Sequence, residues 1–262
     1  MKLLAQLPAM DKLIAELKDA TQVTLGDKLH GLYLFGSLVT GDFDPKTSDI
    51  DLLAIVETDV TETELEQLKG MHQAFVRDHP EWNDRIEVAY VGVEAMKNFK
   101  TKTASIARIS PGEPLHYRDM DVQWLLDWYV VQEQGLILFG PTPKTFIPHI
   151  DRQEFVDMLK DSLPTWRDRV KEAKWKGYQS YIVLSVCRSL YAVRFGTQAS
   201  KVQAAEWVAE EYPEWSSLMK QALTWRGLAG KADSLETQAE TARFVEFGLD
   251  KAKTILSGVK YE

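Results

Sequence analysis

Apolar residues follow one pattern up to about residue 150 and a different one beyond it. Short apolar runs in the first part are typical of buried strands, and they predict strands at residues 31–35, 50–56 and 85–91. Apolar positions at helical spacing predict helices at residues 9–28 and 61–79. The second helix opens with Thr61 and Glu64 at capping-box spacing and ends before Pro80. Strands separated by helices favour a mixed sheet that helices cover.

The second part of the chain shows helical spacing almost throughout, with hardly any strand signals. It predicts helices at residues 151–174, 177–195, 200–211, 214–228 and 234–256. Between the two parts, residues 100–121 contain Pro111, Gly112 and Pro114, which fits either a loop crossing between domains or a hairpin at the sheet edge. We therefore expect an α+β protein, with a mixed sheet in a domain at residues 1–150 and an all-helical bundle at residues 151–262.

Composition narrows the class of protein. Apolar residues make up 45% and charged residues 27% of the 262 residues, an ordinary globular mixture. No apolar run approaches the ~20 residues of a membrane helix, and acidic residues come too early for a secretory signal. The single cysteine, Cys187, excludes an intrachain disulfide and a cysteine-based zinc site. We expect a soluble cytoplasmic protein with no membrane partner.

The net charge of −8 is unevenly distributed. Residues 1–150 hold 14 basic and 23 acidic residues, a net −9, whereas residues 151–262 hold 17 and 16, a net +1. An acidic surface repels polyphosphate backbones and tolerates cations, so no nucleic-acid partner is expected. The alternative explanation of this charge is solubility alone.

The acidic pair Asp49 and Asp51 is the first candidate for chemistry. Side chains two positions apart on a strand point to the same face, so the two carboxylates lie close together, while Ile50 faces the core. Two like charges held so close favour a cation between them. Carboxylate oxygens without His or Cys select Mg²⁺, which completes its shell with water and substrate phosphates. The alternative for the pair is an ordinary surface strand edge.

Gly36 and Ser37 follow directly after a predicted buried strand. A glycine there lets the backbone approach a ligand, and exposed N–H groups with the Ser37 hydroxyl can hold phosphate oxygens. Neither a P-loop nor a Rossmann glycine triplet is present. A simple turn explains this pair alone, but it does not explain why both motifs adjoin apolar runs in one short stretch of chain.

Glu87 lies between Ile86 and Val88 in a strand that otherwise carries buried residues. A buried glutamate without a partner is costly. It therefore either lies on an exposed strand face or joins Asp49 and Asp51, as a metal ligand or as the general base for an attacking hydroxyl.

Together, Gly36-Ser37, Asp49-Ile50-Asp51 and the strand-borne Glu87 resemble the nucleotidyltransferase superfamily shared with DNA polymerase β. Within it, the whole chain is similar to the aminoglycoside adenylyltransferases that modify streptomycin and spectinomycin. In the C-terminal half, the resemblance rests on the run Leu184 to Arg188 and on Lys201 followed by Ala-Ala-Glu-Trp at residues 204–207.

This resemblance implies roles for the three acids. Asp49 and Asp51 would bind magnesium, with two ions expected, and Glu87 would be the catalytic base at the metal site. Two metal ions ~3.5–4 Å apart can clamp the attacking and leaving oxygens of a phosphoryl transfer. The resemblance also implies a nucleotidyltransferase catalytic domain at residues 1–150.

The resemblance implies ATP as the second ligand. Gly36 and Ser37 would hold the leaving pyrophosphate, and Arg188 and Lys201 would reach the ATP phosphates from the helical domain, which would close over the catalytic domain. Alternatives for the two basic residues are a helix surface position for Arg188 and a solvated helix start for Lys201.

The chain departs from the family at two acceptor contacts. Members active on streptomycin carry a Trp and, three residues later, an Asp; here Trp175 matches but Tyr178 occupies the acidic position. The family also has a Trp after a Gly-Glu, where this chain has Pro114. Two alternatives remain for Asp121, Trp124, Asp127 and Trp128. They form a substitute acidic and aromatic surface for the acceptor, or they are divided between the core and a capped surface.

The expected reaction is Mg²⁺-dependent transfer of AMP from ATP to a hydroxyl of a small cationic acceptor, most of all an aminoglycoside or aminocyclitol. An aminocyclitol such as spectinomycin is the first candidate acceptor. Trp175 and Tyr178 are the candidate acceptor contacts, and a monomer is expected. Three alternatives remain: an adenylyltransferase acting on an unidentified metabolite, a non-catalytic nucleotide-binding regulatory module, and a polynucleotide-extending enzyme. Intact acids at all three positions disfavour the module, and the acidic charge disfavours polynucleotide extension.

Overall fold

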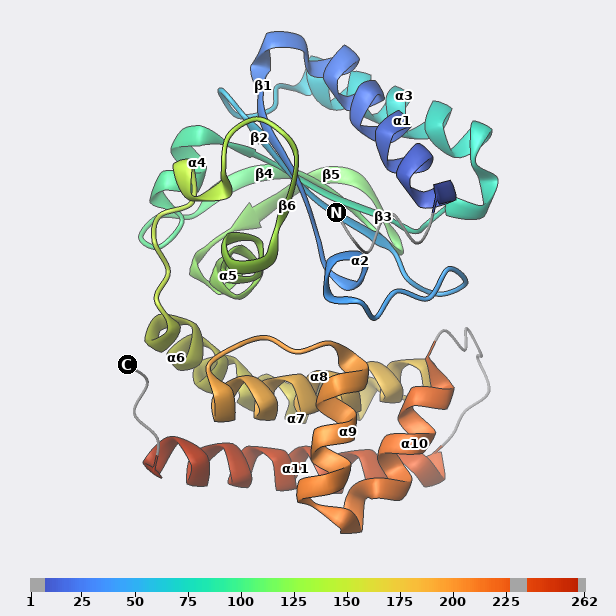
Figure 1. Cartoon of the computed structure of the whole chain (residues 1–262), viewed down its shortest axis with the longest axis vertical. Helices are drawn as coiled ribbons and strands as arrows, with labels where there is room; N and C mark the ends of the chain where they lie inside the picture. The colour runs from blue at the N-terminus through green and yellow to red at the C-terminus, as the bar shows by residue number, and fades with distance from the viewer. Residues whose placement is uncertain (1–7, 227–234, 259–262) are drawn as a thin grey trace. The chain divides into compact units, whose positions relative to one another are not determined.

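The computed structural model describes residues 8–226 and 235–258, which divide into two compact units (Figure 1). The first comprises residues 1–43 and 48–150, and the second comprises residues 44–47 and 151–262. Among the described residues, no helix combines the length and the apolar character needed to cross a membrane.

The first unit is built on a six-stranded mixed sheet in the order β5-β4-β3-β2-β1-β6. β2 and β3 are parallel, and the other neighbouring strands are antiparallel. The strands are β1 (Leu29–Phe35), β2 (Ile50–Val56), β3 (Ile86–Gly92), β4 (Ala104–Ser110), β5 (Glu113–Met120) and β6 (Leu136–Phe139). The three strands predicted from apolar runs are β1, β2 and β3, each within two residues of its predicted bounds.

Helices cover both faces of this sheet (Figure 1). α1 (Pro8–Leu25) and α3 (Glu62–Asp78) bury one face, where their apolar side chains form one core with alternate residues of the strands. α5 (Leu125–Gln134) lies on the other face and contributes the fully buried Trp128. Two short helices, α2 (Ser37–Thr40) and α4 (Val93–Asn98), follow β1 and β3.

The start of α3 agrees with the sequence. Thr61 accepts a hydrogen bond from the backbone N–H of Glu64, whose carboxylate accepts one in return from Thr61 N at 2.7 Å. Lys28 Nζ donates to the same carboxylate at 2.7 Å and ties the helix start to the 3₁₀ turn Gly26–Lys28 before β1. The capping box therefore fixes where α3 begins, as predicted.

Residues 100–121, which fitted two structures, form a hairpin. β4 and β5 pair antiparallel through a turn at Pro111 and Gly112, the latter at φ +80°, and β5 is an edge strand of the sheet. Left-handed backbone favours glycine because a Cβ would be strained there. The short helices α2 and α4, the helix α5 and the edge strand β6 were not predicted.

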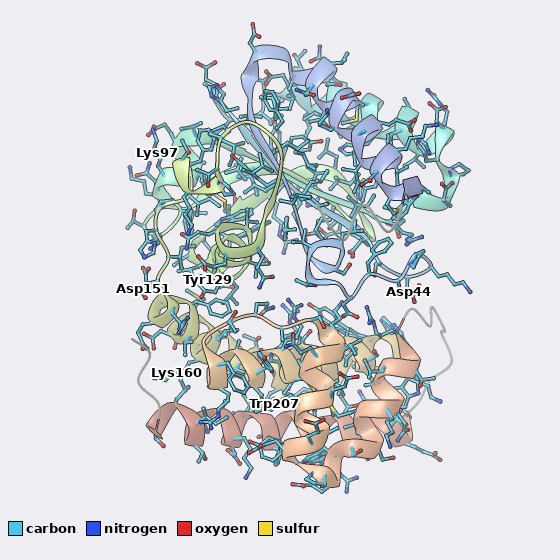
Figure 2. The ribbon with its side chains drawn as sticks, viewed as in Figure 1. Asp44, Lys97, Tyr129, Asp151, Lys160 and Trp207 are labelled. Carbon is cyan, nitrogen blue, oxygen red and sulfur yellow. The ribbon has the colours of Figure 1, made fainter. Side chains whose placement is uncertain are left out.

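The second unit is a helical bundle around α8 (Lys176–Phe195). Apolar residues of α8 are buried on several sides, against α9 (Lys201–Glu211), α10 (Ser216–Trp225) and α11 (Leu235–Gly258). Trp207 of α9, labelled in Figure 2, packs edge-on against Phe195 with ring centroids 5.6 Å apart. Cys187 is fully buried in this core, and burial raises the pKa of its thiol.

The predicted helix at residues 151–174 is two helices. α6 (Arg152–Ser162) and α7 (Trp166–Glu172) are separated by a turn of 3₁₀ helix at Leu163–Thr165. Pro164 lacks a backbone N–H, so a continuous α-helix is interrupted there. The end of the predicted helix 214–228 and the start of the predicted helix 234–256 fall partly outside the described residues. The α+β fold class is confirmed.

Candidate active site

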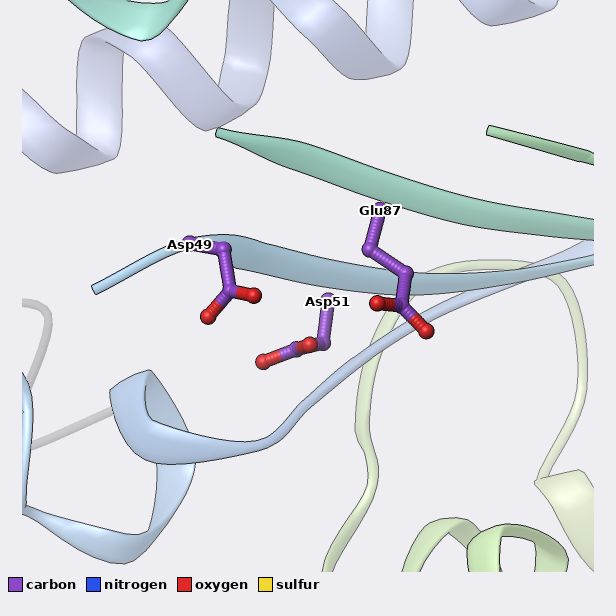
Figure 3. A group of neighbouring side chains, drawn as sticks. All are labelled: Asp49, Asp51 and Glu87. Carbon is purple, nitrogen blue, oxygen red and sulfur yellow. The ribbon is translucent and has the colours of Figure 1, made fainter. Parts of the chain in front are cut away.

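Three carboxylates converge on one face of the sheet in the first unit (Figure 3). Asp49, Asp51 and Glu87 each offer an oxygen, and these oxygens lie within 4.8 Å of one another. Asp49 directly precedes β2, Asp51 lies within it, and the parallel register places Asp51 opposite Glu87 of β3. Alternation along β2 and lateral pairing with β3 therefore bring together acids up to 38 positions apart.

The donor set of this cluster suits a hard divalent cation. All three ligands are carboxylate oxygens, half-buried, and the described part of the first unit brings no His or Cys into the group. Like charges this close repel unless a cation lies between them. Oxygen ligands of this kind select Mg²⁺ over zinc, and Mg²⁺ keeps positions for water and phosphate. The residues present therefore fit the metal that the resemblance implies.

Gly36 makes room for Asp51. Its backbone has φ +73° and ψ −152°, and a Cβ on Gly36 would overlap the Asp51 carboxylate. Ser37 comes next, and its Oγ is buried without a hydrogen-bond partner among the described residues. A buried hydroxyl without a partner is costly, so its place beside the acids fits an oxygen-rich ligand such as a phosphate.

Arg85, which sequence reasoning missed, supports the backbone ahead of Asp49. Its Nε donates to the carbonyl oxygen of Ser48 at 3.0 Å, and its Nη2 donates to the same oxygen. Its guanidinium lies over the Trp82 ring at 4.3 Å, and its own carbonyl accepts from Ile50 N at 3.0 Å. These contacts fix the chain on both sides of Asp49. A basic residue just before a buried strand gave no distinctive signal.

Arg108 of β4 is a second residue that sequence reasoning missed. Its Nη2 donates to Glu87 Oε1 at 2.8 Å, which places a guanidinium against one member of the acidic cluster. The only available signal was a single basic residue between Ala107 and Ile109 in a short strand.

The remaining candidate residues belong to the second unit. Arg188 lies within α8, and the side chain of Gln198 faces its guanidinium; with the amide oxygen turned toward Arg188, it accepts from Nε at 2.9 Å. Lys201 is the first residue of α9, whose start is capped by Ser200 Oγ accepting from Gln203 N at 3.1 Å. Both basic side chains are half-buried.

An exposed row of aromatic rings marks the start of α8. Trp175 stacks on Tyr178 with ring centroids 5.4 Å apart, and Tyr178 stacks on Tyr181 at 6.1 Å. Trp175 is 43% and Tyr181 42% exposed. Burial raises the pKa of the Tyr178 phenol, so the side chain brings no negative charge. Tyr181 was missed, although residues three positions apart on a helix share a face.

The acidic and aromatic residues at positions 121–128, which could form an acceptor surface, lie in different surroundings. Asp121 caps a turn, since its carboxylate accepts from Gln123 N at 2.9 Å. Trp128 is fully buried, and Trp124 stacks on it with ring centroids 5.3 Å apart. Asp121 therefore caps a turn and Trp128 belongs to the core, whereas Trp124 is half-buried against it and Asp127 is exposed in the first turn of α5.

Two family models match successive parts of the chain. A nucleotidyltransferase domain matches residues 11–109, and the C-terminal domain of aminoglycoside adenylyltransferases matches residues 145–250. The first match includes all three clustered acids, and the second includes Trp175, Tyr178, Arg188 and Lys201.

Relatives and a solved structure agree with these matches. An aminoglycoside (3'') (9) adenylyltransferase of Klebsiella pneumoniae is 25% identical over 245 residues, covering 87% of this chain and 88% of that protein. One from Rhizobium radiobacter is 29% identical over 135 residues, and the match spans about half of each protein, 49% and 47%.

The solved structure is that of spectinomycin adenyltransferase AAD(9) from Enterococcus faecialis with ATP and spectinomycin. It superposes with a TM-score of 0.72 at 17% identity, covering 92% of this chain and 98% of that one. By these matches the chain joins a nucleotidyltransferase domain to a domain like the C-terminal domain of aminoglycoside adenylyltransferases, and it is similar to these enzymes over most of its length.

Proposed function

We propose that this enzyme transfers AMP from ATP to a hydroxyl group of an aminocyclitol or aminoglycoside, with spectinomycin as the first candidate, in a magnesium-dependent reaction. The observation that carries the proposal is the convergence of Asp49, Asp51 and Glu87 beside the Gly36–Ser37 turn. The named activities of the relatives, and the ATP and spectinomycin bound in the AAD(9) structure, support the choice of substrates.

Asp49 and Asp51 would hold magnesium, with Glu87 at the same site. When bound, magnesium neutralises charge on the phosphates and orients them for in-line displacement. Two ions are proposed because three carboxylates and a triphosphate supply enough negative charge for both. Gly36 keeps the space in front of Asp51 open, and the Ser37 hydroxyl would donate to an oxygen of the pyrophosphate that leaves.

Glu87 would act as the general base. An acceptor hydroxyl oxygen attacks the α-phosphorus of ATP, the bond from that phosphorus to the pyrophosphate oxygen breaks, and a Glu87 oxygen takes the hydroxyl proton. The second unit would contribute Arg188 and Lys201 to the phosphates, where positive charge offsets the charge of the leaving group. In this proposal residues 1–150 form the catalytic domain, and residues 151–262 serve the substrates.

The aromatic row at Trp175 and Tyr178 would contact the acceptor. Aromatic faces attract ammonium groups and pack on the apolar faces of sugar rings. The position after Trp175 that is acidic in streptomycin-modifying relatives is a neutral Tyr178 here. A tricationic drug would therefore lack one charged partner, and this favours spectinomycin over streptomycin. We propose a cytoplasmic location, because ATP is available in that compartment. The proposed oligomeric state is a monomer.

The test is a transfer assay on the full-length protein. Protein, ATP and MgCl₂ are incubated with spectinomycin, streptomycin or no acceptor; pyrophosphate release is followed, and the product mass is measured. We expect pyrophosphate and an AMP adduct of spectinomycin.

Glu87→Gln is the matched control. It should reduce turnover by about 10²–10⁴-fold while ATP still binds. Pyrophosphate release with a cell extract but with neither drug would instead identify another metabolite as the acceptor. If ATP binds but no acceptor yields an adduct, the chain is a nucleotide-binding module.

A further inference from the structure

Arg108 shares the sheet face of the acidic cluster. The antiparallel register places Arg108 of β4 opposite Ala89, two residues along β3 from Glu87, so all three side chains lie on one face. Arg108 Nη2 donates to Glu87 Oε1 at 2.8 Å, with the two side chains 18% and 25% exposed. Charged hydrogen bonds at this length are stronger than neutral ones, and a partly covered pair is screened less than one in open water.

The guanidinium is held from more than one side. It lies 5.4 Å from the centre of the Trp124 ring, and Trp124 in turn stacks on the buried Trp128. Arg108 Nη1 is 3.7 Å from Glu113 Oε2. Its Nε is buried and has no hydrogen-bond partner within the described part of the chain. The position of the guanidinium therefore leaves one of its N–H groups without a partner in that part of the chain. Its shortest charged contact is the one to Glu87.

This contact changes both the geometry and the charge of the cluster. The guanidinium donates to Oε1 of Glu87, and this hydrogen bond restricts the rotation of the carboxylate. Oε2 is then the oxygen that would contact the metal or take the hydroxyl proton. Three carboxylates carry a formal charge of −3, and Arg108 reduces the total to −2. A positive charge near a metal site also opposes the binding of a further cation, by an amount that grows as solvent is excluded.

We propose that Arg108 is a positioning residue that orients Glu87 for proton transfer and sets how tightly the free carboxylate cluster binds divalent cations. In this role it favours catalysis over tight metal binding: the cluster without nucleotide has a formal charge of −2, which one divalent cation neutralises, and a second metal ion would bind together with the phosphates. The proposal rests on the proposed function of Glu87 and deepens it.

Three variants separate this role from simple support of the hairpin. Arg108→Gln removes the charge, Arg108→Lys keeps the charge but removes the planar fork, and Arg118→Gln is the matched control. Arg118 belongs to the same hairpin and pairs with the same Glu113, at 3.2 Å, but it lies on β5, and its side chain is 46% exposed. Thermal melting checks that each variant is folded.

Metal binding is the first measurement. Mn²⁺ is titrated into nucleotide-free protein and followed by electron paramagnetic resonance. We expect Arg108→Gln to lower the Mn²⁺ Kd by roughly tenfold, because a repelling charge is removed from a partly buried site. Arg108→Lys and Arg118→Gln should bind Mn²⁺ as the unsubstituted enzyme does.

Steady-state kinetics is the second measurement. Arg108→Gln should lower kcat by about 10–100-fold, the usual effect of removing a group that orients a metal ligand, with the KM for the acceptor nearly unchanged. Arg108→Lys should recover part of kcat. Tighter metal binding together with slower turnover is a combination that a merely destabilised hairpin would not produce.

The two failures can be told apart. Unchanged or weaker Mn²⁺ binding in Arg108→Gln, or an unchanged kcat, overturns the role of Arg108. Absence of AMP transfer by the unsubstituted enzyme, with any acceptor, overturns the proposed function instead. In that case the Mn²⁺ titration still decides whether Arg108 tunes the cluster. If Arg108→Gln does not fold, equal kcat values for Arg108→Lys and the unsubstituted enzyme overturn the role of orientation.

Discussion

At the scale of single residues, the site depends on a glycine as much as on its acids. Gly36 combines a positive φ with direct contact to the space that the Asp51 carboxylate occupies. Any side chain at residue 36 would therefore displace a proposed metal ligand as well as strain the backbone.

Gly36→Ala tests this close approach. We expect a loss of turnover of at least tenfold and a weaker affinity for Mn²⁺, because the new Cβ pushes Asp51 from its place. Gly112→Ala is the control, since Gly112 also has a positive φ, +80°, but has open space around its Cβ position. Both variants should lose about 1–3 kcal/mol of unfolding free energy to backbone strain. Equal turnover in the two variants would show that the contact with Asp51 does not matter for activity.

Tyr178→Asp tests the acceptor contact. A carboxylate beside Trp175 would supply a charged partner for a guanidinium-bearing drug, and charged hydrogen bonds are worth about 1.5–3 kcal/mol. The expected result is a rise of roughly tenfold in kcat/KM for streptomycin relative to spectinomycin. Tyr178→Asn is the comparison, because asparagine has the size of aspartate but no charge. A similar rise in both variants would point to space rather than charge as the cause.

The acids of the site and Arg108 differ in how far one sequence predicts where they lie. The proximity of Asp49 and Asp51 could be predicted, because strand alternation is a local rule. Glu87 was left with two alternatives by its own strand, and the family resemblance placed it with the two aspartates. Arg108 could not be predicted, because its role depends on which strand lies beside β3, and the turn at residues 111–112 was compatible with a crossing loop. Pairing between strands is a long-range property that one sequence does not display.

At the scale of elements, the helices and strands differ in how well their sequences specify them. α3 carries its own start signal in Thr61 and Glu64, and strands β1 to β3 carry apolar runs. α5 and β6 have no comparable signals in their sequences. The start of α5 has no side-chain cap, and β6 is an edge strand of only four residues. Their conformation follows from packing against β1 rather than from local pattern.

A buried histidine links α3 to β3 and makes stability depend on pH. The ring Nε2 of His72 lies 2.8 Å from the Tyr90 hydroxyl, and burial lowers the pKa of His72 to about 4. The unfolded chain, with an ordinary His pKa near ~6.5, binds more protons than the fold between these values. His72 therefore favours unfolding increasingly as pH falls from about 6.5 to about 4, and it has no such effect above that range.

The measurement is the unfolding free energy in urea at pH 7 and pH 4.5. The unsubstituted protein should lose more stability between these values than His72→Gln, by about 2–3 kcal/mol. His72→Gln removes the titrating group and keeps a polar side chain toward Tyr90. Equal losses would mean that the carboxylates alone account for the acid sensitivity.

Helix packing in the second unit can be tested at Gly248, with Gly70 of the first unit as the comparison. A Cβ on Gly248 of α11 would lie 2.5 Å from Val186 Cγ1 of α8, whereas a Cβ on Gly70 of α3 has open space around it. Gly70→Ala should raise the unfolding free energy by about 0.5–1 kcal/mol, the ordinary helix preference for alanine. Gly248→Ala should lower it by about 1–3 kcal/mol, because α8 and α11 must move apart. Thermal melts of both variants test the opposite signs.

At the scale of the whole molecule, the uneven charge distribution bears on which acceptors the enzyme takes. The net charge of −8 is the sum of −9 on residues 1–150 and +1 on residues 151–262. A negative potential on this scale attracts cations from solution and repels polyanions. The acidic cluster therefore belongs to the part of the chain that a cationic acceptor approaches most readily.

This steering predicts a specific salt dependence. Raising KCl from 50 to 300 mM shortens the Debye length from about 14 to about 6 Å, so the attraction between the acidic domain and a cationic drug should weaken. We expect the KM for spectinomycin to rise several-fold while kcat stays within about twofold, since salt screens the approach more than the covered contacts of the bound state. Choline chloride in place of KCl controls for specific binding of K⁺. A KM independent of salt would mean that contacts such as the aromatic row, rather than the field of the domain, determine acceptor affinity.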